Sequence, residues 1–205
     1  MSSPSLRLCF FGDSIVTGFG DETQLGWVGR VVGAARRDGW DVTGYNLGVR
    51  GESGPQIAAR WRGEAEPRLC RADGYGVVLA FGVNDTIVDG DRRRVSMSES
   101  LAVLSRVIEE ATAAGLPLLV VGPTLVDDDE QNQRIVDLSE AMGTACADRG
   151  VPFVEVAAGV RDDAWRRDVA SRDGAHPTEH GYERLSRMIY PAVATWLSGL
   201  ASSQR

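Results

Sequence analysis

The side chains of Ser14, Asp173 and His176 are of the types that carry out nucleophilic acyl transfer. Ser14 closes the block Gly12-Asp13-Ser14, and His176 follows Asp173 by three residues. A serine hydroxyl attacks a carbonyl only after a base takes its proton, and imidazole suits this task near neutral pH. A carboxylate beside the imidazole fixes its tautomer and stabilises its protonated form. These residue types therefore indicate chemistry on an ester, provided that the fold brings the two segments together.

Donors for a developing oxyanion are also present near the ends of apolar runs. The Ser14 N–H lies at the start of a predicted helical turn, and Gly48 has no Cβ to block the approach to its N–H. Asn84 supplies a side-chain amide after a third apolar run. Because a tetrahedral intermediate needs N–H groups aimed at its oxygen, we expect Ser14, Gly48 and Asn84 to form an oxyanion hole.

The content of basic residues excludes several other chemistries. The chain of 205 residues has no lysine, so it lacks a Walker-A loop, a Schiff-base lysine and a Ser-x-x-Lys site. Its two histidines are His176 and His180. Their spacing of four would suit a metal site on a helix, but no third ligand stands nearby in the sequence. We expect His180 to be a solvated helix residue, and we expect no metal and no cofactor.

Charge and composition indicate the compartment and the partners. The formal net charge of -7 argues against a nucleic-acid surface or an anionic membrane as partner. No apolar run is long enough for a membrane span, and Arg7 interrupts the short apolar N-terminus. Cys9, Cys70 and Cys146 are odd in number and widely spaced, which argues against a disulfide framework. A cytoplasmic protein acting on a small molecule is expected; the sequence does not indicate its oligomeric state.

Short apolar runs and helical patterns alternate along the chain. The runs expected to form strands buried on both faces are Leu6–Phe11, Val42–Leu47, Tyr75–Phe81, Pro117–Val121 and Pro152–Val156. Helical spacing is found near residues 27–35, 57–61, 101–111, 135–145 and 178–200. Ser96 and Glu99 predict a capping box, and the acidic run 127–130 fits the start of a helix. Pro191 should kink or break the last helix.

This alternation predicts an α/β fold with a five-stranded parallel sheet between two layers of helices, in flavodoxin-like order. We expect one three-layer α/β/α domain over residues 1–205, with a core of about 6–200. In such sheets the chemistry lies in loops beyond the carboxyl ends of the strands. Each of the motifs described above follows a predicted strand or precedes the last helix.

Four blocks resemble the SGNH hydrolases, also called the GDSL esterase/lipase family. They are Gly-Asp-Ser at 12–14, Asn-Leu-Gly at 46–48, Gly-x-Asn-Asp at 82–85 and Asp-x-x-His-Pro at 173–177. The resemblance implies that Ser14 is the nucleophile, His176 the base and Asp173 its orienting acid. It also implies that Gly48 and Asn84 join the Ser14 N–H in the oxyanion hole. Ile15 stands where the family name has leucine, an apolar exchange that should alter only packing.

The resemblance implies ester hydrolysis but does not specify the ester. An acyltransferase using the same site is an alternative, because water and alcohols compete for one acyl-enzyme. A flavodoxin-like binding module is a second alternative, but the loop at 18–23 lacks a third glycine and carries Asp21 and Glu22 where phosphate would bind. The short loops favour small acyl chains, and thioesters are accessible to the same chemistry. Trp165, just upstream of Asp173, is a candidate to line the acyl or alcohol site.

Overall fold

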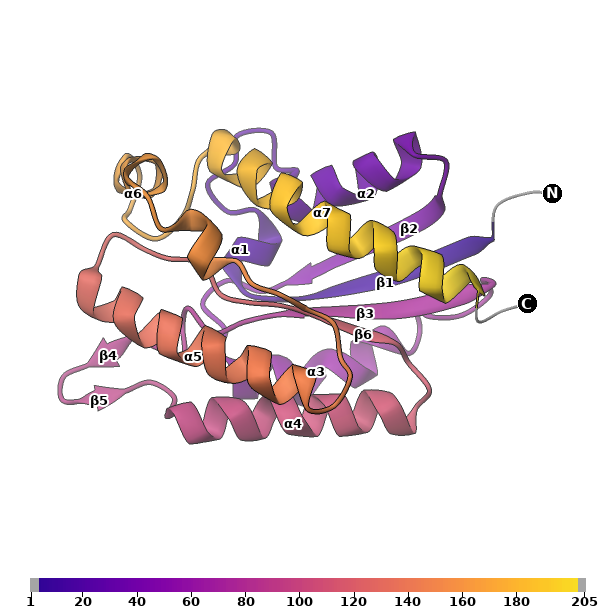
Figure 1. Ribbon diagram of the computed structural model, residues 1–205, viewed down its shortest axis with the longest axis horizontal. Helices are drawn as coiled ribbons and strands as arrows, with labels where there is room; N and C mark the ends of the chain where they lie inside the picture. Colours follow the sequence, from indigo (N-terminus) through magenta and orange to yellow (C-terminus); the bar gives the residue numbers. More distant parts are fainter. Residues whose placement is uncertain (1–3, 203–205) are drawn as a thin grey trace.

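The computed structural model describes residues 4–202, and its centre is a sheet of five parallel strands. The strands are β1 (Ser5–Gly12), β2 (Asp41–Gly48), β3 (Gly74–Ala80), β6 (Leu118–Val121) and β7 (Phe153–Val154). They lie in the order β2-β1-β3-β6-β7, and every neighbouring pair is parallel (Figure 1). The predicted α/β fold with flavodoxin-like strand order is confirmed.

Helices cover both faces of this sheet, which gives the three predicted layers. One face carries α1 (Ser14–Thr17), α2 (Gly26–Arg37) and α7 (Glu179–Ser202), and the other carries α3 (Gly54–Ala65), α4 (Met97–Ala113) and α5 (Asp129–Ala147) (Figure 1). In β1, Leu8 and Phe10 join the apolar cluster of the α2 and α7 face, whereas Cys9 and Phe11 join the cluster of the α3 and α4 face. Because successive side chains of a strand point to opposite faces, an unbroken apolar run suits a strand covered on both sides.

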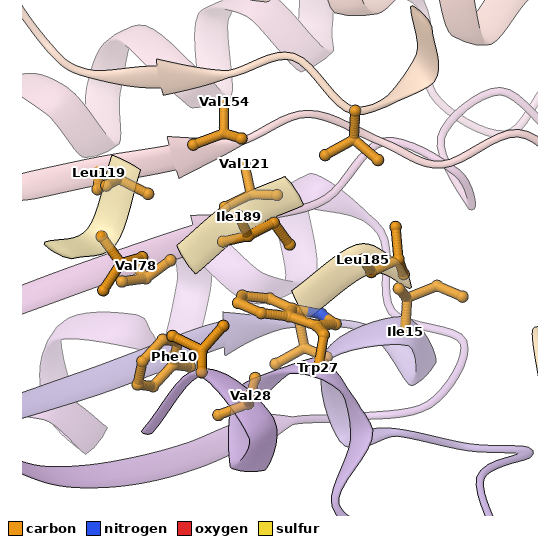
Figure 2. Packing of buried hydrophobic residues seen from close by; sticks show 14 of the residues in the cluster. Phe10, Ile15, Trp27, Val28, Val78, Leu119, Val121, Val154, Leu185 and Ile189 are labelled. Atoms are coloured by element: carbon orange, nitrogen blue, oxygen red, sulfur yellow. The ribbon is translucent and has the colours of Figure 1, made fainter. Parts of the chain in front are cut away.

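The core on the α2 and α7 face holds the carboxyl end of β1 in place. Figure 2 shows Phe10, Val78 and Leu119, from three neighbouring strands, in the cluster with Trp27 of α2 and Ile189 of α7. The rings of Phe10 and Trp27 meet edge to face with their centroids 5.8 Å apart. Burial of such large apolar side chains is the main stabilising contribution to a fold of this kind. This packing fixes the strand end that Ser14 follows.

Two helices begin at the polar residues that the sequence indicates. The Ser96 hydroxyl oxygen accepts a hydrogen bond from the Glu99 N–H at 3.2 Å, and α4 starts at Met97. The Asp128 carboxylate accepts from the Gln131 N–H at 2.8 Å, and α5 follows. Each cap satisfies a backbone N–H that has no acceptor within its own helix.

Pro191 does not break α7, which runs through this residue from Glu179 to Ser202. Ile189 and Val193, on either side of the proline, are buried in the core. Their burial offsets the loss of one backbone hydrogen bond at the proline. The expected kink or break therefore does not end the helix.

Four short elements had no counterpart in the prediction. A 3-10 turn at Ala157–Val160 and helix α6 (Asp163–Ala170) follow β7 in the stretch that the sequence marks only as charged. Strands β4 (Val88–Asp89) and β5 (Arg92–Arg93) form a small antiparallel hairpin between β3 and α4. These elements are too short to show a clear period in the apolar residues.

Candidate active site

Ser14 lies at the first turn after β1, where backbone and helix are packed very closely. A Cβ on Gly12 would lie 2.3 Å from the Ala80 carbonyl oxygen and from a methyl of Val16, so only glycine fits between β3 and α1. The Asp13 carboxylate caps α1 by accepting a hydrogen bond from the Ile15 N–H at 2.9 Å. These contacts fix the backbone of Ser14 at the carboxyl end of the sheet, which is the usual position of sites in this architecture.

Ser14, His176 and Asp173 are brought together by the fold although the serine is 162 residues from the histidine. His176 Nε2 lies 2.7 Å from Ser14 Oγ, and His176 Nδ1 lies 2.6 Å from Asp173 Oδ2. The other carboxylate oxygen of Asp173 accepts from the backbone N–H groups of Ala175 and His176. Ser14 is buried, whereas the side chain of Asp173 is 48% exposed. The imidazole therefore bridges a buried hydroxyl and a carboxylate that solvent reaches.

The Asp173 carboxylate is held in its charged form. Partial burial raises its pKa, but the hydrogen bonds from the backbone and ring of His176 and from the Ala175 N–H outweigh this effect. The net result is a pKa below the ordinary value. A carboxylate that remains ionised near neutral pH stabilises the imidazolium that forms when His176 takes a proton.

Phe19 packs against His176, and Arg50 in turn lies over Phe19; the sequence analysis did not identify either residue. The ring of Phe19 meets the His176 ring edge to face with centroids 4.7 Å apart. The Arg50 guanidinium lies over the Phe19 ring, with its central carbon 3.3 Å from the ring centroid. The Tyr182 hydroxyl donates to the Phe19 carbonyl oxygen at 2.7 Å and fixes that loop to α7. Neither Phe19 nor Arg50 belongs to a recognisable motif, so no sequence signal indicated them.

The predicted donor Gly48 already has an acceptor. Its N–H donates to the side-chain oxygen of Asn46 at 3.1 Å, and a Cβ on Gly48 would lie 2.5 Å from the Thr17 nitrogen. Gly48 thus allows β2 to pack closely against α1. Gly51, three residues later, has a positive φ of 79° and open space above its Cα. Among the described residues its N–H has no acceptor, which makes Gly51 a candidate donor that the sequence analysis missed.

Asn84 follows β3, and its amide nitrogen donates two hydrogen bonds. Its Nδ2 donates to Asp13 at 3.2 Å and to the Glu52 carbonyl oxygen at 3.0 Å. Asp13 directly precedes Ser14, and Glu52 directly follows Gly51. Asn84 therefore links the segment of the serine to the loop after β2. The spacing of the Gly-x-Asn-Asp block gave its position but not these partners.

Two buried carboxyl groups lie behind these residues. Burial raises the pKa of Asp13 to about 7 despite the Ile15 N–H, and the charge of Asp85 adds to the increase. Burial likewise raises the pKa of Asp85, although it accepts hydrogen bonds from the Gly54 N–H and the Ser100 hydroxyl. A buried carboxyl group with a raised pKa favours its neutral form, so Asp13 changes charge close to neutral pH.

The raised pKa of Asp13 predicts that the protein loses stability as the pH rises. At pH values between the ordinary pKa of 3.8 and the raised pKa of about 7, Asp13 holds a proton in the folded state that it releases in the unfolded state. The free energy of unfolding should therefore fall by about 2–3 kcal/mol from pH 5 to pH 8 on account of this group. Asp13→Asn, which keeps the acceptor for the Ile15 N–H, should remove most of that fall. Urea denaturation of both proteins at the two pH values measures the difference.

Asp91→Asn, at an exposed position in the β4–β5 hairpin, is the matched control and should retain the fall seen in the wild type. Asp173 has a lowered pKa, so it titrates below this pH window and does not mask the effect. An equal change in stability from pH 5 to pH 8 in Asp13→Asn and in the wild type would show that Asp13 is charged throughout.

Trp165 and His180 lie apart from the hydrogen-bonded chain at Ser14. Trp165 is 2% exposed, belongs to the core cluster and donates its ring N–H to the Leu125 carbonyl oxygen at 2.8 Å. Its location gives it a packing role, and no contact connects it with Ser14. His180 is exposed in the first turn of α7.

Within residues 4–202, no three or more His, Cys, Asp and Glu side chains are grouped to hold a metal ion. Over the same range, no helix combines the length and hydropathy needed to cross a bilayer.

The protein has a three-layer α/β/α fold in which Ser14, at the carboxyl end of β1, is hydrogen-bonded to His176. The model of the GDSL-like lipase/acylhydrolase family matches residues 10–184. The chain belongs to this family and is a carboxylic ester hydrolase. The family resemblance that the four sequence blocks indicated is thereby confirmed.

Solved structures with the same fold cover nearly the whole chain. A catalytic mutant of Axe2, an acetylxylan esterase from Geobacillus stearothermophilus, is 18% identical with a TM-score of 0.73, over 94% of this chain and 96% of that chain. A member of the lipolytic protein G-D-S-L family from Veillonella parvula DSM 2008 is 19% identical with a TM-score of 0.71, over 90% of this chain and 96% of that chain. At such identities the similarity shows a shared fold. No curated protein sequence matches the chain.

Proposed function

We propose that the protein hydrolyses small carboxylic esters through an acyl-enzyme on Ser14. The observation that carries this proposal is the continuous hydrogen-bonded chain from Ser14 Oγ through His176 to Asp173, with distances of 2.7 and 2.6 Å. When the Nδ1–H donates a hydrogen bond to the Asp173 carboxylate, Nε2 presents a lone pair to the Ser14 hydroxyl. Ser14 then acts as nucleophile, His176 as general base and acid, and Asp173 as the group that orients the imidazole.

The reaction proceeds in two halves through the same groups. Ser14 Oγ attacks the carbonyl carbon of the ester while His176 Nε2 takes the hydroxyl proton. The tetrahedral intermediate collapses when His176 gives this proton to the leaving alcohol oxygen, and the acyl group stays on Ser14. Water then enters, loses a proton to His176 and attacks the acyl carbon. Collapse of the second intermediate releases the acid and returns the proton to Ser14 Oγ.

The oxyanion requires donors that are free or exchangeable when the substrate arrives. The Ser14 N–H has no acceptor among the described residues and is the first donor of the proposed hole. We assign the second to Gly51 instead of Gly48, because the Gly48 N–H is engaged by Asn46. Asn84 Nδ2 becomes the third donor when its bond to Asp13 or to the Glu52 carbonyl oxygen gives way. Each such donor typically contributes about 3–4 kcal/mol to stabilising the transition state.

A small cavity beside Asp13 and Ile15 and an open groove near His176 support an ester with a small acyl group and a polar alcohol. The apolar cavity beside Asp13 and Ile15 is lined by core residues such as Trp27 and not by Ser14, and its volume of about 20 Å³ leaves no room for a long acyl chain. An open groove of about 380 Å³ runs along residues 17–24 and reaches Arg172. It adjoins His176, since a Cβ on Gly20 would lie 3.4 Å from that of His176. The charged Glu22 and Arg172 side chains along this groove suit an alcohol that carries hydroxyl groups, such as a sugar.

A series of p-nitrophenyl esters from acetate to palmitate tests the acyl preference. We expect kcat/KM to be highest for acetate and to fall at least about tenfold by octanoate, because each buried methylene needs space that the site lacks. Acetylated xylooligosaccharides extend the series to a sugar alcohol, as the similar fold of the acetylxylan esterase suggests. An optimum at octanoate or longer would contradict the assignment of small acyl groups.

Covalent labelling tests the nucleophile directly. A fluorophosphonate should add its phosphonyl group to the proteolytic peptide that contains Ser14 and to no other peptide, and urea-unfolded protein should remain unlabelled. Adding an alcohol to the ester assay separates hydrolysis from acyl transfer, the alternative use of the same acyl-enzyme. Release of free acid faster than new ester supports a hydrolase, whereas the reverse result would favour a transferase.

A further inference from the structure

Arg60 of α3 reaches across to the carboxyl ends of two strands. Its Nη2 donates to the Leu47 carbonyl oxygen at 2.8 Å and to the Gly12 carbonyl oxygen at 3.3 Å. Gly12 is the last residue of β1, and Leu47 is the last but one of β2. The side chain of Arg60 is 17% exposed, and its guanidinium lies 5.7 Å from the centre of the Phe11 ring. One half-buried cation thus ties together the two strand ends from which the loops of the site leave.

The same guanidinium holds the loop between β2 and α3. Arg60 Nε donates to the Glu52 carboxylate at 2.7 Å, and Arg60 Nη1 donates to Glu64 at 3.1 Å. The Glu52 side chain is as buried as that of Arg60, at 17% exposure. A planar guanidinium can serve several acceptors in one fixed geometry, and the single ammonium of a lysine cannot reproduce this. Arg60 therefore holds both the end of β2, at Leu47, and the loop that follows it, at Glu52.

That loop carries the groups proposed to bind the oxyanion. Gly51 directly precedes Glu52, and the Glu52 carbonyl oxygen accepts from Asn84 Nδ2 at 3.0 Å. The Val49 N–H donates to the Gly12 carbonyl oxygen at 2.9 Å, so the loop also returns to the end of β1. A displacement of Glu52 would move the Gly51 N–H and release one partner of Asn84. The positions of Gly51 and Asn84, two of the three proposed donors, therefore depend on the contact between Arg60 and Glu52.

We infer that Arg60 is a positioning residue for the oxyanion hole, acting through Glu52 on Gly51 and Asn84. This inference rests on the proposed function, and Arg60 itself touches no reacting atom. Donors placed in advance stabilise the transition state more than the bound substrate, so their displacement lowers kcat and leaves KM nearly unchanged. Arg60 would thus influence the rate of the chemical step through the loop, without contacting the substrate.

Steady-state kinetics of Arg60→Gln test the inference. We expect kcat on p-nitrophenyl acetate to fall about 10- to 100-fold while KM changes less than about threefold. Arg60→Lys keeps the positive charge but not the planar guanidinium with its several donors, so its kcat should lie between those of Arg60→Gln and the wild type. Arg62→Gln removes an exposed arginine two residues along α3, and it should behave as the wild type. Unchanged kcat in Arg60→Gln would overturn the inference, and so would a loss carried by KM alone.

Hydrogen exchange of the backbone amides gives a readout that does not depend on ester hydrolysis. In Arg60→Gln the hydrogen-bonded amides of Val49, Glu52 and Ser53 should exchange at least about tenfold faster, while those of β3 keep the wild-type rate. Unchanged exchange in the loop would overturn the positioning role whether or not the protein hydrolyses the esters tested. If the loop responds and fluorophosphonate fails to label Ser14, the proposed function is at fault and the positioning of the loop stands.

A variant on the other side of the ion pair covers the case in which Arg60→Gln does not fold. Glu52→Gln keeps the backbone carbonyl that Asn84 binds but weakens the bond to Arg60. It should speed up exchange of the Val49, Glu52 and Ser53 amides and lower kcat, as the arginine variant does. A Glu52→Gln protein with wild-type kcat and wild-type exchange would contradict the inference.

Discussion

Replacement of Ser14 by alanine will reduce ester hydrolysis at least about 10⁴-fold, to near the background rate. The variant lacks the oxygen that attacks the carbonyl, so no acyl-enzyme forms and the donors of the oxyanion hole have no covalent intermediate to stabilise. His176, 2.7 Å from Ser14 Oγ in the wild type, is left without the proton that it would take. The measurement is kcat/KM on p-nitrophenyl acetate for purified wild type and variant, together with the yield of fluorophosphonate label.

The matched control is Ser171→Ala, which removes a serine hydroxyl from an exposed position close to Asp173 in the sequence. It should retain full activity. Thermal unfolding of Ser14→Ala should stay close to that of the wild type, because the hydroxyl contributes a single side-chain hydrogen bond, worth about 1 kcal/mol. More than a tenth of wild-type activity in well-folded Ser14→Ala protein would exclude this serine as the nucleophile.

Replacement of His176 by glutamine will lower kcat/KM by about 10⁴-fold, because an amide cannot take the proton from Ser14 at neutral pH. Glutamine retains a polar side chain of similar reach, so the change separates proton transfer from packing against Phe19. KM should change little if the imidazole acts in the chemical step and not in substrate binding. Initial rates over a range of substrate concentrations provide both constants.

The chain offers a close control in its second histidine. His180→Gln makes the same substitution at an exposed position of α7, four residues away, and should leave kcat/KM within about twofold of the wild type. Equal losses in the two variants would mean that the substitution acts through stability or surface charge. Full activity in His176→Gln would leave Ser14 without its base and refute the proposed mechanism.

Most of the fold could be predicted from the sequence because its strands are buried on both faces. A run such as Leu6–Phe11 can satisfy apolar contacts on both sides only inside a sheet covered by helices. The predicted break at Pro191 is absent because the packing of Ile189 and Val193 against the core outweighs the local preference of proline. The sequence did not predict helix α6, because only Trp165 and Val169 of its eight residues are buried apolar side chains and two positions do not define a helical period.

The candidate site could be predicted in part, and the difference lies in how each residue is recognised. Ser14, Asp173 and His176 combine a distinctive chemical type with a location at the ends of predicted elements, so their proximity could be inferred. Arg60 acts through carbonyl oxygens that any residue possesses, and no pattern of residue types reveals such partners. Gly51 differs from Gly48 only in its backbone conformation and in the acceptor of its N–H, and both depend on how β2 ends against α1.

The distance along the chain between Ser14 and His176 has a consequence for the use of this enzyme as a tool. The turn at Gly150, exposed between α5 and β7, separates a segment that carries the serine and Asn84 from a segment that carries His176 and Asp173. Neither piece alone has both halves of the proton-transfer pair, so a chain divided at this turn can hydrolyse an ester only where the two pieces dock. Two fusion partners that bring the pieces together would then report their encounter as colour from a chromogenic ester, with very little signal from unassembled fragments.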